Sequence, residues 1–183
     1  MTNSPRSGSD PIGSTNVVDV LAEPVRRWIY RQNWTNLRDV QKRAIPAILA
    51  GGDVIVAART AAGKTEAVML PLLTRLLNRE DRGVDGFGII YVSPLKALIN
   101  DQGRRLDELC ATCDLPLHRW HGDVSATDKR RARDRPSGLL LITPESLEAT
   151  LVRRGGDVVS LFAKAEAVVV DELHAFIGTE RGV

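Results

Sequence analysis

Apolar and polar positions form alternating blocks along most of the chain. Short, nearly continuous apolar runs occur at residues 53–58, 87–93, 115–121, 138–143 and 165–171. Runs of this length without a period of two are typical of strands that are buried on both faces. Amphipathic stretches with helical spacing separate them, at about residues 64–79, 94–112, 125–135 and 144–154. The alternation predicts an α/β fold with a mostly parallel sheet sandwiched by helices.

Two helical patterns precede the first of these runs. One covers residues 25–32 with Pro24 at the first helical position, and the other covers residues 37–51, where we expect a kink at Pro46 and a stop at Gly51. Residues 1–16 are rich in Ser, Thr, Asn, Gly and Pro, so we expect a disordered tail there. Residues 17–183 are then expected to form one domain.

Composition narrows the class of protein only slightly. The chain is 43% hydrophobic and 26% charged, with a formal net charge of +2 and an isoelectric point near 8.7. Such a balance permits a polyanionic partner without arguing for one. No apolar run is long enough to span a bilayer, and the N-terminus has no apolar core of a signal peptide. We therefore expect a soluble cytoplasmic protein with no membrane partner.

The two cysteines, Cys110 and Cys113, are too few for a disulfide framework. Their C-x-x-C spacing also occurs in zinc half-sites and redox motifs. His118 and His121 are poorly placed to complete four zinc ligands, so free thiols are the favoured interpretation.

The stretch "ARTAAGKTEA", residues 58–67, follows an apolar run and leads into a helical pattern. A phosphate-binding loop requires this context of strand, loop and helix. Gly63 allows close approach to phosphate oxygens, Lys64 would reach the β- and γ-phosphates of ATP, and the Thr65 hydroxyl would hold Mg²⁺. The candidate nucleotide-binding residues of the loop are Thr60, Ala61, Ala62, Gly63, Lys64 and Thr65. The alternative is a GKT sequence that occurs by chance at a helix start.

Two positions of this stretch, 58 and 61, carry alanine, although glycine would allow a wider range of backbone angles. Ala58 is tolerable if its position does not need positive φ. Ala61 is the more demanding substitution, because a side chain narrows the permitted backbone angles.

The segment "AVVVDELH", residues 167–174, supplies acidic groups at the end of an apolar run. Asp171 would hold Mg²⁺, and Glu172 would act as the general base for the attacking water. Lys64, Asp171 and Glu172 are therefore the candidate catalytic residues, with Thr65 and Asp171 as candidate Mg²⁺ ligands. A strand that ends in a solvated Asp-Glu pair is the alternative, and His174 by itself indicates little.

Several segments in this order resemble the motifs of superfamily 2 DEAD/DExH helicases. They are "ARTAAGKT", "SPLKAL", "TPESL" and "DELH", preceded by "LRDVQKRAIPAILAGGD", which is similar to the family's Q motif. Three segments are most similar to the large helicase-related subgroup of this family: "YVSPLKALINDQ", "WHGD" and "DELHAFIGTERG". The resemblance covers about residues 25–183. It implies the N-terminal RecA-like lobe of a phosphate-loop NTPase, and a Gln41 that reads the adenine edge of ATP. Arg59 and Ala61 depart from the family's usual loop.

The resemblance also implies that the protein binds DNA or RNA through the sugar-phosphate backbone of the nucleic acid. The candidate contacts are Pro94, Lys96, Gly122, Thr143 and Glu145. For "TPESL" taken alone, a helix N-cap is the favoured interpretation. Residues 128–135 carry five basic and two acidic residues, which favours a solvated helix face over an accessory phosphate contact. Trp34 and Trp120 are expected in the core.

Helicases of this family have two lobes with ATP between them, and the strand bearing the Ser-Ala-Thr motif lies between the phosphate-loop strand and the DExH strand. This sequence ends twelve residues after Asp171 and contains neither that motif nor a second lobe. We therefore expect an incomplete lobe, in which the phosphate-loop strand and the DExH strand lack the strand that would hydrogen-bond to both. We expect no unwinding by this polypeptide alone. Two alternatives remain: a small phosphate-loop kinase, and a non-catalytic single-lobe nucleic-acid-binding remnant.

Overall fold

The apolar runs of the sequence form a parallel sheet in the computed structural model, which describes residues 16–59, 61–80, 86–153 and 155–178. Its strands are β1 (Ile89–Val92), β2 (Leu117–Trp120), β3 (Leu139–Ile142) and β4 (Ala167–Val170). The order across the sheet is β2-β3-β1-β4, and every pair is parallel. The predicted α/β class and parallel sheet are confirmed.

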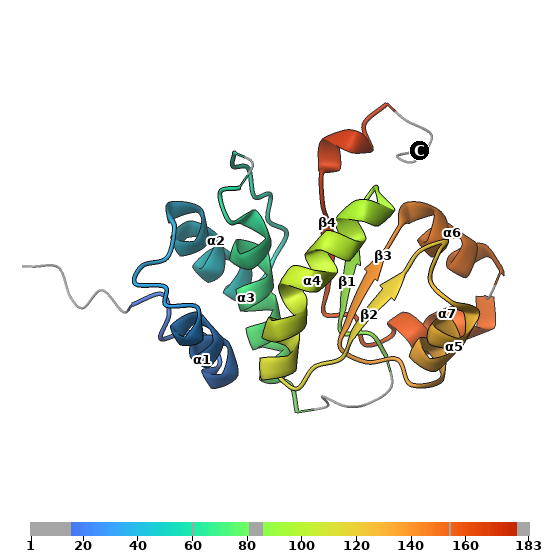
Figure 1. Ribbon diagram of the computed structural model, residues 1–183, viewed down its shortest axis with the longest axis horizontal. Helices are drawn as coiled ribbons and strands as arrows, with labels where there is room; N and C mark the ends of the chain where they lie inside the picture. The colour runs from blue at the N-terminus through green and yellow to red at the C-terminus, as the bar shows by residue number, and fades with distance from the viewer. Residues whose placement is uncertain (1–15, 60, 81–85, 154, 179–183) are drawn as a thin grey trace, which may run out of the picture.

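Helices cover both faces of this sheet (Figure 1). On one face lie α1 (Glu23–Arg31), α2 (Asp39–Leu49), α3 (Lys64–Leu77) and α4 (Lys96–Thr112), which share a core with Ile89 and Tyr91 of β1. On the other lie α5 (Ala126–Asp134), α6 (Pro144–Arg153) and α7 (Gly155–Phe162), and the core there includes Ile90 and Val92. Successive β1 side chains thus point to opposite faces, and all four are buried.

Helix boundaries follow local sequence signals. Pro24 lies in the first turn of α1, where a missing N–H costs nothing. Helix α2 continues through Pro46 and is followed by Gly51 at φ +81°, so the predicted stop is confirmed. The Ser125 hydroxyl caps α5 by accepting the Asp128 N–H at 3.1 Å. Helix α7 was not predicted, because its short apolar run follows two glycines and has no clear helical period.

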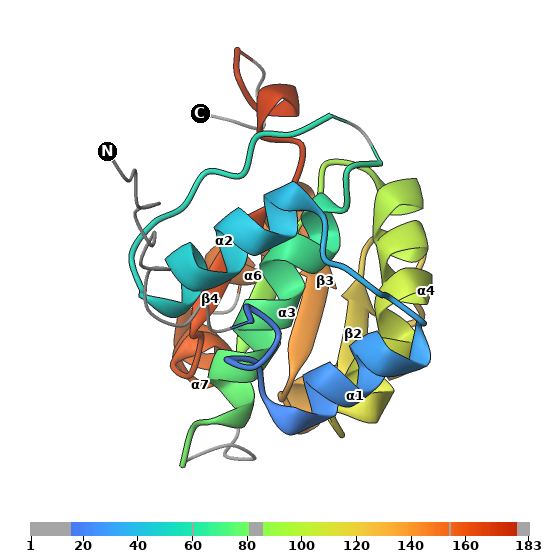
Figure 2. The ribbon, with the colours of Figure 1, turned by 90° about the vertical axis from the view of Figure 1, so that its left-hand side faces the viewer.

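The predicted strand at residues 53–58 is wrong. These residues lie between α2 and α3 without strand structure (Figure 2). Four of the six, Asp53, Val54, Ile55 and Ala57, are exposed. Within the described residues they form no ladder with any strand, and β4 occupies an edge of the sheet. A strand needs a neighbour that satisfies its backbone N–H and C=O groups. The expectation that the phosphate-loop segment and the DExH strand share no ladder is confirmed.

Residues 1–15 lie outside the described residues, so the predicted tail stays a prediction. Within the described part of the chain, no helix is long and apolar enough to cross a membrane.

Candidate nucleotide and nucleic-acid sites

The candidate phosphate-binding loop, residues 58–65 and here called the phosphate loop, runs into the first turn of α3. Two of its described residues have left-handed backbone. Ala61 has φ +61° and Gly63, which precedes Lys64, has φ +86°. Ala58 is not among the described residues with positive φ, so the prediction that alanine is tolerable there is confirmed. The left-handed angle falls instead on Ala61, where the sequence identified the more demanding substitution. Thr60 lies outside the described residues.

Gln41 of α2 and Arg38, which directly precedes that helix, pack against this loop. The buried Gln41 accepts the Arg38 N–H through Oε1 at 2.9 Å, and its Nε2 would lie 2.7 Å from a Cβ added at Gly63. The Arg38 guanidinium donates to the Ala61 carbonyl oxygen. The resemblance implied only that Gln41 reads adenine, whereas the structure shows it packed against the phosphate loop. Glycine suits residue 63 because of its positive φ, and an added Cβ there would also displace the end of the Gln41 side chain.

The Lys64 ammonium donates to the Ala58 carbonyl oxygen at 2.9 Å. This bond folds the lysine side chain back across its own loop. Because an ammonium has three N–H donors, Lys64 can keep this bond and still donate to two phosphate oxygens.

The acidic pair follows directly after β4. The Asp171 N–H donates to the Val92 carbonyl oxygen at 2.9 Å, which continues the ladder between β4 and β1. Asp171 Oδ1 accepts the Glu172 N–H at 3.0 Å. Glu172 adopts φ +50°, and its Oε2 lies 3.3 Å from His174 Nδ1. His174, to which the sequence assigned no role, therefore contacts the candidate general base.

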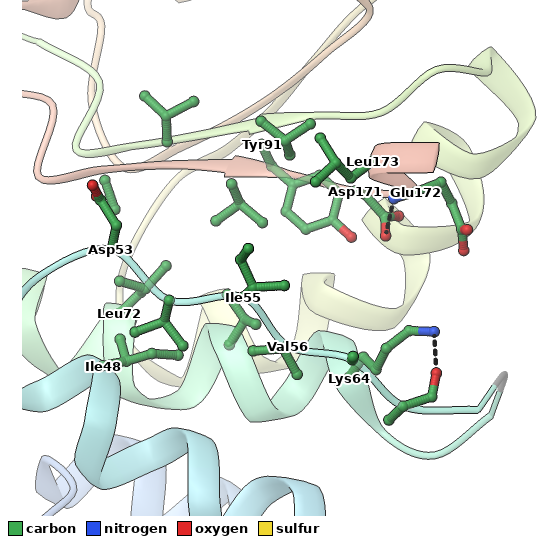
Figure 3. A pocket seen from close by; sticks show the side chains of 18 of the residues that line it. Ile48, Asp53, Ile55, Val56, Lys64, Leu72, Tyr91, Asp171, Glu172 and Leu173 are labelled. Carbon is green, nitrogen blue, oxygen red and sulfur yellow. Dashed lines mark hydrogen bonds between the residues drawn. The ribbon is translucent and has the colours of Figure 1, made fainter. Parts of the chain in front are cut away.

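Ala58 and Lys64 of the loop line one cavity of about 830 Å³ together with the acidic pair. Lys64 lies across this cavity from Asp171 and Glu172 (Figure 3). The segment 53–58 and the exposed edge of β4 form its walls. Residues more than a hundred positions apart in the sequence therefore meet at the carboxyl end of the sheet, where open α/β sheets bind ligands.

Tyr91 is a lining residue that sequence reasoning missed. It is 2% exposed, lies on β1, and points its hydroxyl toward Asp171 (Figure 3). Burial, followed by the charge of Asp171, raises the pKa of Tyr91 above its ordinary value. The signal available in the sequence was one polar atom within an otherwise apolar strand, "IIYV".

Candidate nucleic-acid contacts lie at the carboxyl ends of β1, β2 and β3. The Lys96 ammonium donates to Asp123 Oδ1 at 2.8 Å and passes beside Gly122. This hydrogen bond and the lysine's charge lower the pKa of the Asp123 carboxyl. Both side chains are more than half exposed, and such pairs contribute little to stability, so Lys96 is available to another anion.

The other candidates differ in accessibility. Pro94 is buried, and Glu145 is exposed in the first turn of α6. Thr143 is buried and accepts the Ser146 N–H through Oγ1 at 3.4 Å, as expected of an N-cap. Of the five candidates, Lys96, Gly122 and Glu145 are on the surface, whereas Pro94 and Thr143 shape the loops beneath it.

Three further expectations concern residues outside these sites. Only Ala132 of α5 is buried, so its charged residues form a solvated face. Trp120 is in the core, and Trp34 packs edge-to-face on Trp28 at 5.3 Å. Cys110 and Cys113 are buried free thiols, and no cluster of metal-ligating side chains occurs among the described residues.

Comparison with known proteins identifies the family. The model of the DEAD/DEAH box helicase family matches residues 38–183, which include the phosphate loop and the acidic pair. The chain belongs to the DEAD/DEAH box helicase family. This membership supports the helicase hypothesis over the small phosphate-loop kinase.

Relatives within this helicase family include Lhr-type proteins. The chain is 31% identical to "ATP-dependent helicase Lhr-Core protein 2" of Thermococcus barophilus, over 91% of this chain and 20% of that protein. A solved structure, the helicase Lhr of Mycobacterium smegmatis bound to ssDNA and AMP-PNP, superposes with a TM-score of 0.76 at 27% identity. The match covers 92% of this chain and 22% of that one. The chain thus spans about a fifth of the length of these two relatives.

The fold also matches more distant helicases. The RNA helicase Prp28 of Chaetomium thermophilum, bound to ADP, has a TM-score of 0.78 at 24% identity, over 96% of this chain and 43% of that one. This likeness supports the RecA-like fold of the DEAD/DEAH box lobe.

Proposed function

We propose that this chain is the ATP-binding and nucleic-acid-binding lobe of an ATP-dependent helicase. In the longer protein, ATP hydrolysis would be coupled to movement along a DNA or RNA strand. The observation that carries the proposal is the single cavity shared by Lys64, Asp171 and Glu172. Family membership and Lhr-type relatives named as ATP-dependent helicases support it.

The nucleotide half of the proposal assigns a role to each side of the cavity. Backbone N–H groups of residues 61–65 and the Lys64 ammonium would hold the phosphates, because they meet at the N-terminus of α3. Thr65 and Asp171 fit a Mg²⁺ ion bound mainly through phosphate and water oxygens, since their donors are oxygens and one is a carboxylate. Such an ion would neutralise developing charge on the phosphates. Glu172, in contact with His174, would orient and deprotonate the attacking water.

The nucleic-acid half of the proposal centres on Lys96. Its ammonium is exposed beside Gly122, and among the described residues its ion-pair partner is the exposed Asp123. Contacts of this kind bind phosphates and carry no base sequence, so the surface supports a strand of DNA or RNA alike. The Lhr structure bound to ssDNA supports this assignment.

A nucleotide-binding experiment tests the first half. Lys64→Ala is expected to weaken AMP-PNP binding by about 10- to 100-fold, because a hydrogen bond to a charged group contributes roughly 1.5–3 kcal/mol. Lys42→Ala is the matched control, since Lys42 is an exposed lysine of α2 away from the cavity. Equal binding by the Lys64→Ala and Lys42→Ala variants would contradict the assignment.

A strand-binding experiment tests the second half. Lys96→Ala is expected to weaken binding of a fluorescent single-stranded oligonucleotide, and to reduce the slope of log K against log salt by about 0.7. If Lys96→Ala leaves the affinity for the oligonucleotide unchanged at every salt concentration, this surface does not hold the strand. Strand binding without any nucleotide binding would favour the non-catalytic remnant instead.

A further inference from the structure

His121 is a buried polar side chain to which the proposed function assigns no role. It directly follows β2, in the segment "WHGD". His121 is 4% exposed, although the next two residues, Gly122 and Asp123, lie on the surface. A buried imidazole lowers stability unless its nitrogens have hydrogen-bond partners, so these partners are the feature to explain.

One ring nitrogen of His121 has a partner on α4. Its Nε2 lies 3.1 Å from Asn100 Oδ1. The oxygen of an amide can only accept, so this hydrogen bond requires a proton on Nε2. Burial lowers the pKa of His121, which keeps the ring neutral near pH 7 and leaves Nδ1 without a proton. Nδ1 has no hydrogen-bond partner among the described residues, so within them Asn100 is the polar anchor of the ring.

Asn100 shares one face of α4 with Lys96. The two residues are four positions apart on the helix, so their side chains are neighbours. The Lys96 ammonium donates to the exposed Asp123 at 2.8 Å, and Asn100 accepts from the buried His121 at 3.1 Å. Helix α4 therefore holds residues 121–123 at two points, one exposed and one buried.

The segment held in this way is a tight turn. The Val124 N–H donates to the His121 carbonyl oxygen at 3.1 Å, so Gly122 and Asp123 are the central residues of the turn. The Lys96 ammonium would lie 3.3 Å from a Cβ added at Gly122. The Lys96–Asp123 pair restrains the turn only weakly, because both side chains are more than half exposed. The partly buried hydrogen bond to Asn100 is the stronger restraint.

We propose that His121 is a positioning residue for nucleic-acid binding, which holds the turn 121–124 against α4 through Asn100. Gly122 and Lys96 then face the same stretch of sugar-phosphate backbone. This inference rests on the nucleic-acid half of the proposed function. His121 is buried and does not itself contact the strand, so its effect on binding passes through the hydrogen bond to Asn100.

Two replacements of His121 separate this hydrogen bond from the ring. His121→Gln keeps an amide N–H at about the reach of imidazole Nε2, whereas the side chain of His121→Asn is too short to reach Asn100. Affinity is measured by fluorescence anisotropy with labelled single-stranded oligonucleotides of DNA and of RNA. We expect His121→Asn to weaken binding about three- to tenfold, which corresponds to one neutral hydrogen bond, and His121→Gln to stay within about twofold of the wild-type chain.

His118 supplies the matched control. It lies three residues earlier, on β2, and its ring packs edge-on against Phe87 at 5.6 Å. His118→Asn makes the same chemical change at a position away from the turn and is expected to leave the affinity unchanged.

Asn100→Ala breaks the same hydrogen bond from the other side. Asn100 is an exposed residue of α4, and alanine is the better helix former, so this variant is expected to fold. It should weaken binding as much as His121→Asn does. The double variant should bind no more weakly than either single variant, because both changes remove one interaction.

Three results would overturn the inference. Additive losses in the double variant would mean that Asn100 contacts the strand itself. A loss in His121→Gln as large as that in His121→Asn would make the ring a packing residue. Unchanged affinity in both His121→Asn and Asn100→Ala would show that the hydrogen bond does not affect strand binding.

Lys96→Ala distinguishes the inference from the function on which it rests. If Lys96→Ala weakens strand binding but His121→Asn and Asn100→Ala do not, the inference fails and the proposed function stands. If the wild-type chain binds neither oligonucleotide, or Lys96→Ala has no effect, the nucleic-acid half of the proposed function fails and the inference fails with it.

Discussion

Ala61 and Gly63 show how the backbone of the phosphate loop depends on single residues. Both have left-handed φ, at +61° and +86° respectively, but their surroundings differ. The Ala61 side chain is exposed, whereas a Cβ at residue 63 would meet Gln41 Nε2 at 2.7 Å. Alanine at residue 63 would therefore have to displace the Gln41 amide, whereas the Ala61 side chain is exposed.

This contrast predicts opposite effects of two small substitutions. Gly63→Ala should lower the free energy of unfolding by about 2 kcal/mol or more, through unfavourable φ and overpacking. Ala61→Gly should leave it unchanged or raise it by up to about 1 kcal/mol, because relief of the left-handed strain is offset by the backbone entropy of glycine. Denaturant unfolding of both variants provides the measurement. Similar losses of stability in the two would contradict this description of the loop.

Buried thiols provide a second prediction at the scale of residues. Burial raises the pKa of Cys110 to about 12 and that of Cys113 to about 11. The folded chain thus favours neutral thiols, a contribution to stability that is complete below the unfolded pKa near 8.5 and is lost as the pH rises through 11–12. Near pH 8, iodoacetamide should alkylate both at least about a hundredfold more slowly than in guanidinium chloride. Mass spectrometry follows the reaction, and equal rates would show that the thiols are accessible.

At the scale of elements, β4 and the segment 53–58 face each other without pairing. Val168 and Val170 of β4 remain 61% and 45% exposed, and Ile55 of the segment is 86% exposed. The apolar pattern at 53–58 resembles a buried strand, which is why the sequence predicted one. The apolar pattern of a segment indicates that its residues are suited to a strand. A strand also requires a neighbouring strand in the sheet with which it can pair. The true strands at 89–92 and 139–142 have neighbours on both sides.

Hydrogen exchange tests this difference between elements. Amides of residues 54–58 should exchange near the rate of an unfolded chain, whereas those of β1 and β3 should be protected by their ladders. Protection of 54–58 equal to that of β1 would mean that this segment is paired in solution.

At the scale of the whole molecule, the site is an outcome of chain topology. Lys64 and Asp171 were predicted as parts of one catalytic site, and both line one cavity although residues 53–58 form no strand. The sheet order β2-β3-β1-β4 does not follow from hydrophobic pattern, because nothing local specifies which strands are neighbours. The orientation of the Tyr91 hydroxyl toward Asp171 (Figure 3) depends on that order and on the register. It could not be predicted from the strand's sequence alone.

The central claim is that the phosphate loop and the Asp171–Glu172 pair bind the same nucleotide. Paramagnetic broadening by Mn²⁺–AMP-PNP, followed in amide NMR spectra of the isotopically labelled chain, tests it most directly. We expect amides of residues 63–65 and of Asp171 and Glu172 to broaden together, while amides of β2, at the opposite edge of the sheet, stay sharp. Broadening of residues 63–65 with sharp signals from Asp171 and Glu172 would contradict the account.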